Sequence, residues 1–285
     1  MQTYLDCYPC FVRQALDAAR MAGADEAVTL KIVQRTLALL QDVPPDATPP
    51  EIGDRVHRLV RAIAGDGDPY RAVKDEATRE ALALYPRLKA LIADASDSLE
   101  RAVRVAIAGN IIDFGPGNSY DLETAVAEIL ERPLALDDLD ALRDALQAAD
   151  TLLYLGDNAG ETVFDRALIE TLELDVVYAV KGGPVLNDAT LEDARAAGLE
   201  GAAELVSTGS NAPGTILART SDEFRRRFVE AEIIIAKGQA NYETLSPGDR
   251  RIFFLLKAKC PVIARDLGVE AGDLVVKQGQ LQAAS

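Results

Sequence analysis

Apolar residues recur every three or four positions through the first hundred residues. The segments with this spacing are 11–23, 26–41, 51–65, 72–95 and 96–107. Such spacing is typical of amphipathic helices. Stretches rich in proline and glycine at 43–50 and 65–70 separate several of them, since these residues stop one helix before the next begins. The pattern predicts a helical region over residues 1–105, arranged as an antiparallel bundle.

The pattern changes to short apolar runs in the second half of the chain. These runs are 151–156, 175–180, 203–208, 232–237, 260–265 and 273–277. Rich in Val, Ile and Leu, they predict buried strands, and helical stretches lie between several of them. Alternating strands and helices favour a mainly parallel sheet covered by helices on both faces, a three-layer α/β/α domain over residues 106–285. Ligands bind such sheets at the carboxyl ends of the strands.

Polar residues follow two of the predicted strands at those ends. Asp157 and Asn158 come after the 151–156 run, and Asn187 and Asp188 come after the 175–180 run. Carboxylate and amide oxygens are the ligands that hard divalent cations prefer. If both pairs lie at the same edge of the sheet, they can share a cation. Alternatively, each pair caps a helix or forms a turn.

Three further features follow strands or interrupt apolar sequence. Lys237 ends the 232–237 run beside Gly238, where it either holds a phosphate or lies solvated at the surface. The small polar loop 207–215 either accommodates a phosphate or ribose or simply turns the chain. Asn110 and Asp113 stand in apolar sequence, as turn formers or as part of a pocket floor.

Cysteine and histidine offer two other kinds of site. Cys7 and Cys10 have the Cys-x-x-Cys spacing of redox motifs and of half a metal site, and Cys260 joins them only if the fold brings it near. A packing role for these thiols is the alternative. His57, the one histidine, lies in an amphipathic helix and is expected to face solvent. The glycine-rich fingerprints of dinucleotide-binding and P-loop proteins are missing.

Charge narrows the possible partners. The chain has 46 acidic and 30 basic residues and a formal net charge of −16, which would repel nucleic acids. An anionic substrate therefore needs a bound cation or a few lysines. No apolar stretch approaches the roughly 20 residues of a membrane helix, and the first residues do not have the pattern of a secretory signal. Together with three cysteines, this predicts a cytoplasmic protein without nucleic-acid or membrane partners.

Six motifs, in this order along the chain, resemble those of the damage-control phosphatase family, in its small cysteine-containing branch from archaea and bacteria. They are CYPC at 7–10, DPYRAVK at 68–74, GNIIDFG at 109–115, GDNAGE at 156–161, KGGPVLNDAT at 181–190 and AKGQANYETL at 236–245. The resemblance implies a helical amino-terminal region packed on a Rossmann-like α/β domain. It also implies hydrolysis of small phosphoesters, such as sugar phosphates or damaged phosphometabolites, supported by Mn, Co, Ni or Mg.

The resemblance also implies roles for particular residues. Asp157, Asn158 and Asp188 would hold the metal, and with Lys237, which would contact the phosphate, they form the expected catalytic set. The expected substrate-binding residues are Asn110, Asp113, Glu161, Lys181 and Asn187. Either Glu161 or Asp113 would orient the attacking water, or Asp157 would attack phosphorus directly.

Two other functions stay open from the sequence. The same pocket can belong to a sensor that binds a metal and a phosphorylated metabolite without hydrolysing it. In a third interpretation, Cys7 and Cys10 form a redox or zinc element and the α/β domain binds a cofactor. In the phosphatase and sensor interpretations the partner is a small phosphorylated metabolite, and the sequence predicts no oligomeric state.

Overall fold

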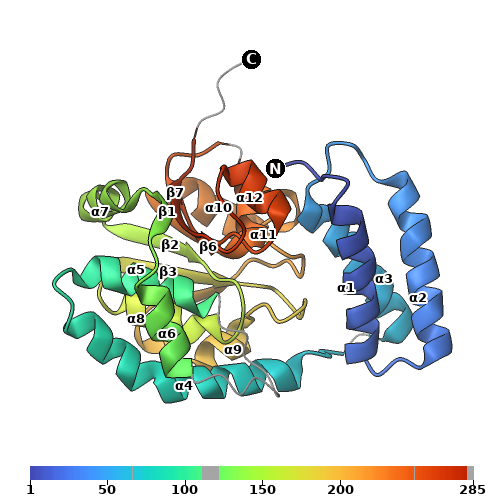
Figure 1. Cartoon of the computed structure of the whole chain (residues 1–285), viewed down its shortest axis with the longest axis horizontal. Coiled ribbons are helices and arrows are strands. Elements are labelled where there is room, and N and C mark those ends of the chain that lie inside the picture. Colours follow the sequence, from blue (N-terminus) through green and yellow to red (C-terminus); the bar gives the residue numbers. More distant parts are fainter. Residues whose placement is uncertain (66, 111–121, 247, 281–285) are drawn as a thin grey trace.

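The computed structural model describes residues 1–65, 67–110, 122–246 and 248–280 (Figure 1). Its described residues up to Leu130 form helices, and from Leu134 onward strands and helices alternate. The helices are α1 (Cys7–Met21), α2 (Glu26–Leu39), α3 (Pro49–Ala64), α4 (Arg71–Ala93), α5 (Ser98–Gly109), α6 (Leu122–Leu130), α7 (Leu139–Ala148), α8 (Glu161–Ile169), α9 (Leu191–Ala196), α10 (Asp222–Glu230), α11 (Gly238–Leu245) and α12 (Pro261–Leu267). The strands are β1 (Leu134–Asp137), β2 (Thr151–Leu155), β3 (Asp175–Val180), β4 (Glu204–Ser207), β5 (Ile233–Lys237), β6 (Ile252–Lys257) and β7 (Leu274–Gln278). Among the described helices, none is long and apolar enough to cross a membrane.

The strands form one sheet in the order β1-β7-β6-β5-β2-β3-β4. All neighbouring strands are parallel except β6 and β7, which are antiparallel. At the centre of the sheet, Tyr154 of β2 pairs with Tyr178 of β3 and with Ile235 of β5. The mainly parallel α/β sheet expected from the sequence is confirmed, and it places the carboxyl ends of β2, β3 and β5 side by side.

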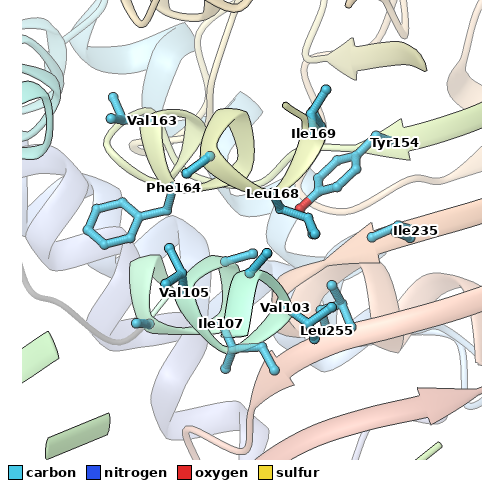
Figure 2. Close-up of a cluster of buried hydrophobic side chains, with 14 of the residues drawn as sticks. Val103, Val105, Ile107, Tyr154, Val163, Phe164, Leu168, Ile169, Ile235 and Leu255 are labelled. Atoms are coloured by element: carbon cyan, nitrogen blue, oxygen red, sulfur yellow. The ribbon is translucent and has the colours of Figure 1, made fainter. Parts of the chain in front are cut away.

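Helices cover both faces of the sheet. On one face Tyr154, Ile235 and Leu255 point toward α5 and α8, as Figure 2 shows. Their strand neighbours Leu153, Ile234 and Phe254 point to the opposite face, where α10, α11 and α12 supply the other side of the core. Both faces are apolar, so these strands are continuous hydrophobic runs rather than alternating ones.

Helices α5 and α8 pack at short range because α5 ends in small residues. A Cβ added at Gly109 would lie 2.9 Å from Cβ of Phe164, too close for two carbon atoms. This contact positions the first residues of α8 against the sheet. It matters for the site because α8 begins with Glu161.

The first five helices do not form the single bundle expected from their periodicity. Helices α1, α2 and α3 share a small core of their own, built around Phe11, Ile32 and Ile52. Helices α4 and α5 instead pack against α8 and join the core of the sheet. Amphipathic spacing shows which face of a helix is buried but not its partner, which explains the error. The division of the chain into residues 1–105 and 106–285 stays a prediction.

One predicted strand is wrong. Residues 261–267 form α12, with Pro261 in its first turn, and not a strand over 260–265. The sixth strand is instead Ile252–Lys257, a run that is buried almost throughout, and β1 at Leu134–Asp137 was also missed. Short apolar runs do not distinguish buried helices from buried strands, and the proline was the local signal for a helix start.

Ion pairs of the DPYRAVK motif connect α4 with the start of α9. Lys74 is fully buried and lies 2.9 Å from both Asp68 and Asp193, and Arg71 lies 2.7 Å from Asp193. Asp193 also accepts a hydrogen bond from the backbone N–H of Thr190, the residue that caps α9. This network fixes the end of the KGGPVLNDAT loop, which carries Asn187 and Asp188.

His57 is buried rather than solvent-facing, so that expectation is wrong. Its side chain is 4% exposed, and its Nε2 has no hydrogen-bond partner among the described residues. Burial, with a smaller effect of the Arg61 charge, lowers the pKa of His57 from 6.5 to about 4. The helix turns this residue toward the core of α1–α3 and the 184–186 segment, which local periodicity did not reveal.

This buried imidazole makes folding stability depend on pH. Because its folded pKa is lowered, the unfolded chain binds more protons between pH 6.5 and about 4, so stability is full above pH 6.5 and is lost as the pH falls. We expect the effect to reach about 3 kcal/mol by pH 4. The free energy of unfolding, measured by urea titration across this range, should fall less steeply in His57→Gln than in the unchanged protein. Equal slopes would contradict the burial of a neutral imidazole.

Candidate active site

Two loops at the carboxyl edge of the sheet are joined through their backbones. Asp157 follows β2, and Asp188 lies in the loop between β3 and α9. The N–H of Ala189 donates to the carbonyl of Asp157 at 2.8 Å, and the N–H of Ala159 donates to the carbonyl of Asn187 at 2.9 Å. Asn158 and Asp188 form a short antiparallel bridge. The two acid–amide pairs therefore share one corner of the sheet.

The carboxyl groups of this corner lie away from bulk water. Asp157 is 8% exposed and Asp188 is 4% exposed. Burial, with the nearby charges of Glu161 and Asp188, raises the pKa of Asp157 well above its ordinary value. Burial also raises the pKa of Asp188, against the opposing charge of Lys181. Two desolvated acids so close together disfavour ionisation unless a cation joins them.

Glu161 and two asparagines surround Asp157. The amide of Asn110 donates to Oδ2 of Asp157 at 3.1 Å and to Oε1 of Glu161 at 2.7 Å. The amide of Asn158 also donates to Oδ2 of Asp157, at 3.4 Å, and to Oε1 of Glu161. The amide nitrogens of both asparagines thus donate to carboxylates, and their amide oxygens can still accept a bond from another partner or bind a cation. The predicted residues Asn110, Asp157, Asn158 and Glu161 form one cluster.

Lys237 lies beneath this cluster and is fully buried. Its ammonium group is 2.5 Å from Oδ1 of Asp165 and 3.3 Å from Oε2 of Glu161, and it donates to the carbonyl of Ala106 at 2.8 Å. Burial would lower the pKa of Lys237, but the carboxylates of Asp165 and Glu161 outweigh it and raise that pKa. An ammonium group has three donors, and all three are used inside the protein.

The other predicted residues occupy different environments. Lys181 is buried, donates to the carbonyl of Gly214 and lies 3.4 Å from Oδ2 of Asp188. Asn187 is exposed at the mouth of the site, which it reaches through the same loop as Asp188. Asp113 lies outside the described residues. The structure thus brings Lys181 to the acidic corner and keeps it from solvent.

A cavity of about 680 Å³ opens beside Asp157 and Asp188. Helices α1 and α3 form one wall with Phe11 and Pro50, and the segment 259–262 forms another. Cys7, Cys10 and Cys260 all line this cavity as free thiols, so the fold does bring the third cysteine near the first two. The helical region therefore contributes directly to the space above the sheet edge.

Gln239, Glu243 and Lys259 are among the residues that line this cavity and were missed from the sequence. Burial raises the pKa of Glu243 to about 7, and Gln239 donates to it at 2.9 Å. Gln239 and Glu243 lie in the AKGQANYETL motif, so the motif itself was a signal. Lys259 was missed because it follows β6, a strand that the sequence did not predict, so its position at a strand end was not apparent.

The donor set at the acidic corner fits a hard divalent cation. Oδ1 of Asn110 is buried and accepts no hydrogen bond from the described residues, and Oδ2 of Asp188 is buried with only the 3.4 Å ion pair to Lys181. Such atoms are costly to bury unless a ligand completes them. Across the described ranges there is no group of three or more His, Cys, Asp or Glu side chains arranged for a metal ion. The metal ligands expected here, Asp157, Asn158 and Asp188, comprise two carboxylates and one amide, so they do not count as such a group. Among the described residues, the cysteine thiols do not form a metal-binding group either.

Known proteins match the chain along nearly all of its length. The model of the damage-control phosphatase ARMT1-like domain matches residues 3–275. A damage-control phosphatase of Pyrococcus horikoshii is 37% identical over 99% of this chain and 100% of its own, and one of Archaeoglobus fulgidus is 34% identical over 95% and 97%. The crystal structure of a DUF89 family protein of P. horikoshii superposes with a TM-score of 0.91 at 37% identity, covering 98% of this chain and 100% of its own. The chain belongs to the damage-control phosphatase ARMT1-like family, as its motifs indicated.

Proposed function

We propose that this protein is a metal-dependent phosphatase that hydrolyses small phosphoesters, such as sugar phosphates or damaged phosphometabolites. The observation that carries the proposal is the pair of buried carboxylates, Asp157 and Asp188, held together at one wall of the cavity. Membership of a phosphatase family supports the reaction class.

Asp157, Asn158 and Asp188 would hold the divalent cation, which would be Mn, Co, Ni or Mg. A cation at this position would supply charge neutralisation for a phosphoryl group and would activate water for attack. The protein's own residues prepare the site: Asn110 holds the carboxylates of Asp157 and Glu161 in place, and Lys237 balances the charge behind them. Burial of these groups keeps their electrostatic effect on a phosphate strong.

The cavity beside Asp157 and Asp188 is much larger than a phosphate group and is closed on one side by helices α1 and α3. Its size suits a small organic group attached to the phosphate. Glu161 lies at the same corner, where it would orient the attacking water. Direct attack of Asp157 on phosphorus is the other route.

The proposal is tested by a metal-by-substrate screen. Purified protein is stripped with EDTA, and release of p-nitrophenol or inorganic phosphate is then followed with p-nitrophenyl phosphate and sugar phosphates, each with Mn²⁺, Co²⁺, Ni²⁺ or Mg²⁺. We expect turnover only with added metal. Saturable binding of a sugar phosphate without any release would instead identify the sensor function. Bound zinc that is lost in Cys7→Ser, in a protein that releases no phosphate, would favour the cysteine interpretation.

Gly238 offers a sharp test of the site's geometry. Its φ is +78°, and an added Cβ would collide with the carboxylate of Asp157. In Gly238→Ala we expect kcat/KM for p-nitrophenyl phosphate to fall about 100-fold or more, because small displacements of reacting groups cost this much. Gly268→Ala is the matched control, since its φ is +75° and no atom lies within 4 Å of the Cβ position there. Unchanged activity in Gly238→Ala would show that the position of Asp157 is not critical.

A further inference from the structure

The CYPC motif has no role in the proposed phosphatase reaction, yet it lies at the same cavity. The chain has three cysteines, and Cys7, Cys10 and Cys260 all line this cavity as free thiols. Cys7 and Cys10 belong to the first turn of α1, and Cys260 precedes the first residue of α12. The fold thus brings all three sulfur atoms together from opposite ends of the chain.

The first two thiols are spaced for a disulfide. Residues i and i+3 of an α-helix have Cα atoms about 5 Å apart, and disulfides join Cα atoms that are roughly 4.4–6.8 Å apart. Cys7 and Cys10 have this spacing in α1, and Pro9 between them is tolerated because an N–H in the first turn has no partner within the helix. Since the described part of the chain has no group of three or more His, Cys, Asp or Glu side chains arranged for a metal ion, these thiols suit pairing better than metal binding.

The two thiols differ in their access to solvent. Cys10 is exposed, and the amide of Gln14 donates to its Sγ at 3.5 Å. Cys7 is half-buried and packs against both the core of α1–α3 and the core on the α12 side of the sheet. A reagent from solvent therefore meets Cys10 first, and Cys7 is the thiol placed to react with Cys10 afterwards.

The surroundings of this pair favour a lasting bond between the two sulfurs. Desolvation raises the pKa of Cys7 and of Cys10, and the nearby charges of Cys260 and Glu243 add to the increase. Thiols with a raised pKa are poor leaving groups, so a disulfide between them is slow to open.

We infer that Cys7 and Cys10 form a redox-responsive site, which reacts with a small-molecule disulfide and closes a disulfide of its own. The thiolate of Cys10 attacks one sulfur of the small disulfide, whose S–S bond breaks and releases one thiolate. The thiolate of Cys7 then attacks the Cys10 sulfur of this mixed disulfide and releases the second thiolate. Two protein thiols are oxidised, one small disulfide is reduced to two thiols, and the protons of Cys7 and Cys10 end on those thiols.

The new bond would change the cavity wall formed by α1. It would draw the sulfur of Cys7 toward Cys10 and away from the contact between the two cores. The effect on turnover rests on the proposed function. We expect kcat/KM for p-nitrophenyl phosphate, with Mn²⁺ present, to fall about 3- to 10-fold in the oxidised protein, mainly through KM, because the wall changes and the acidic corner does not.

The test is a disulfide map by mass spectrometry after incubation of the purified protein with oxidised glutathione. We expect one disulfide, between Cys7 and Cys10, which dithiothreitol reverses. Cys7→Ser should stop at a mixed disulfide of Cys10 with glutathione, and Cys10→Ser should react at least about 10-fold more slowly, because Cys7 is less accessible. Cys260→Ser is the matched control and should form the same disulfide as the unchanged protein.

The two readouts separate the inference from the phosphatase function. A bond from Cys260 to either of the other cysteines, or three thiols that stay free, would overturn the inference. Equal kcat/KM in the reduced and oxidised protein would overturn the effect on turnover. A protein that releases no p-nitrophenol with any metal would overturn the phosphatase function, and the disulfide map would still decide the role of Cys7 and Cys10.

Discussion

Replacing Asp188 by Asn is expected to lower metal-dependent kcat/KM by at least about 1000-fold, and Asp157→Asn should do the same, since each change removes one of two charges that attract a cation. The variants should stay folded. The two acids are buried together with raised pKa values, so a neutral amide relieves their repulsion. Without metal, we therefore expect the melting temperature of Asp157→Asn to be unchanged or higher, as is common when a strained active site is neutralised. In Asp188→Asn the loss of the ion pair with the buried Lys181 offsets this gain.

The matched control for these variants is Asp6→Asn. Asp6 lines the same cavity but is exposed, and its ion pair with Arg265 is long, at 3.5 Å. Its replacement should leave turnover close to that of the unchanged protein. If Asp157→Asn or Asp188→Asn kept full activity with every metal, the acidic corner would not be the catalytic centre.

Replacing Lys237 by Met is expected to destabilise the protein by about 3–5 kcal/mol, because it leaves buried carboxylates without their cation. Asp165 is fully buried, and it also accepts hydrogen bonds from Tyr154 and Tyr178 at 2.7 Å each. The network continues through Glu161 to the acidic corner, so activity should fall as well. The free energy of unfolding from denaturant titration is the measurement that checks this.

A second substitution separates a structural role of Lys237 from contact with substrate. In Lys237→Met combined with Asp165→Asn, the unpaired charge next to the ammonium position is removed, so part of the lost stability should return. If Lys237→Met were as stable as the unchanged protein but inactive, the lysine would act on the phosphate, as its strand-end position suggested from the sequence.

The fold could be predicted to the extent that periodicity determines it. Runs such as Leu152–Leu155 are apolar on both faces, which indicates a covered parallel sheet, and the structure confirms this. Helix α12 was missed because Val262 and Ile263 are equally suited to a buried strand. The packing of α4 against α8 could not be predicted either, because it depends on the tertiary partner and not on the sequence of α4 alone.

The candidate site was predictable where residues are close in sequence and follow strands. Asp157 and Asp188 could be placed at one edge because parallel strands end there together. The environments of Lys237, His57 and Lys259 could not be predicted, because each depends on residues that are far away in the chain. Lys237 finds Asp165 from α8 and Ala106 from α5, and only the fold distinguishes this buried lysine from the exposed Lys259.

The most direct test of the shared cation is a crystal of this protein grown with Mn²⁺ and measured near the manganese absorption edge. We expect one anomalous peak at the corner where the loops after β2 and β3 meet, in contact with Asp157, Asn158 and Asp188. A peak bound by only one of the two aspartates, or located elsewhere in the molecule, would contradict it.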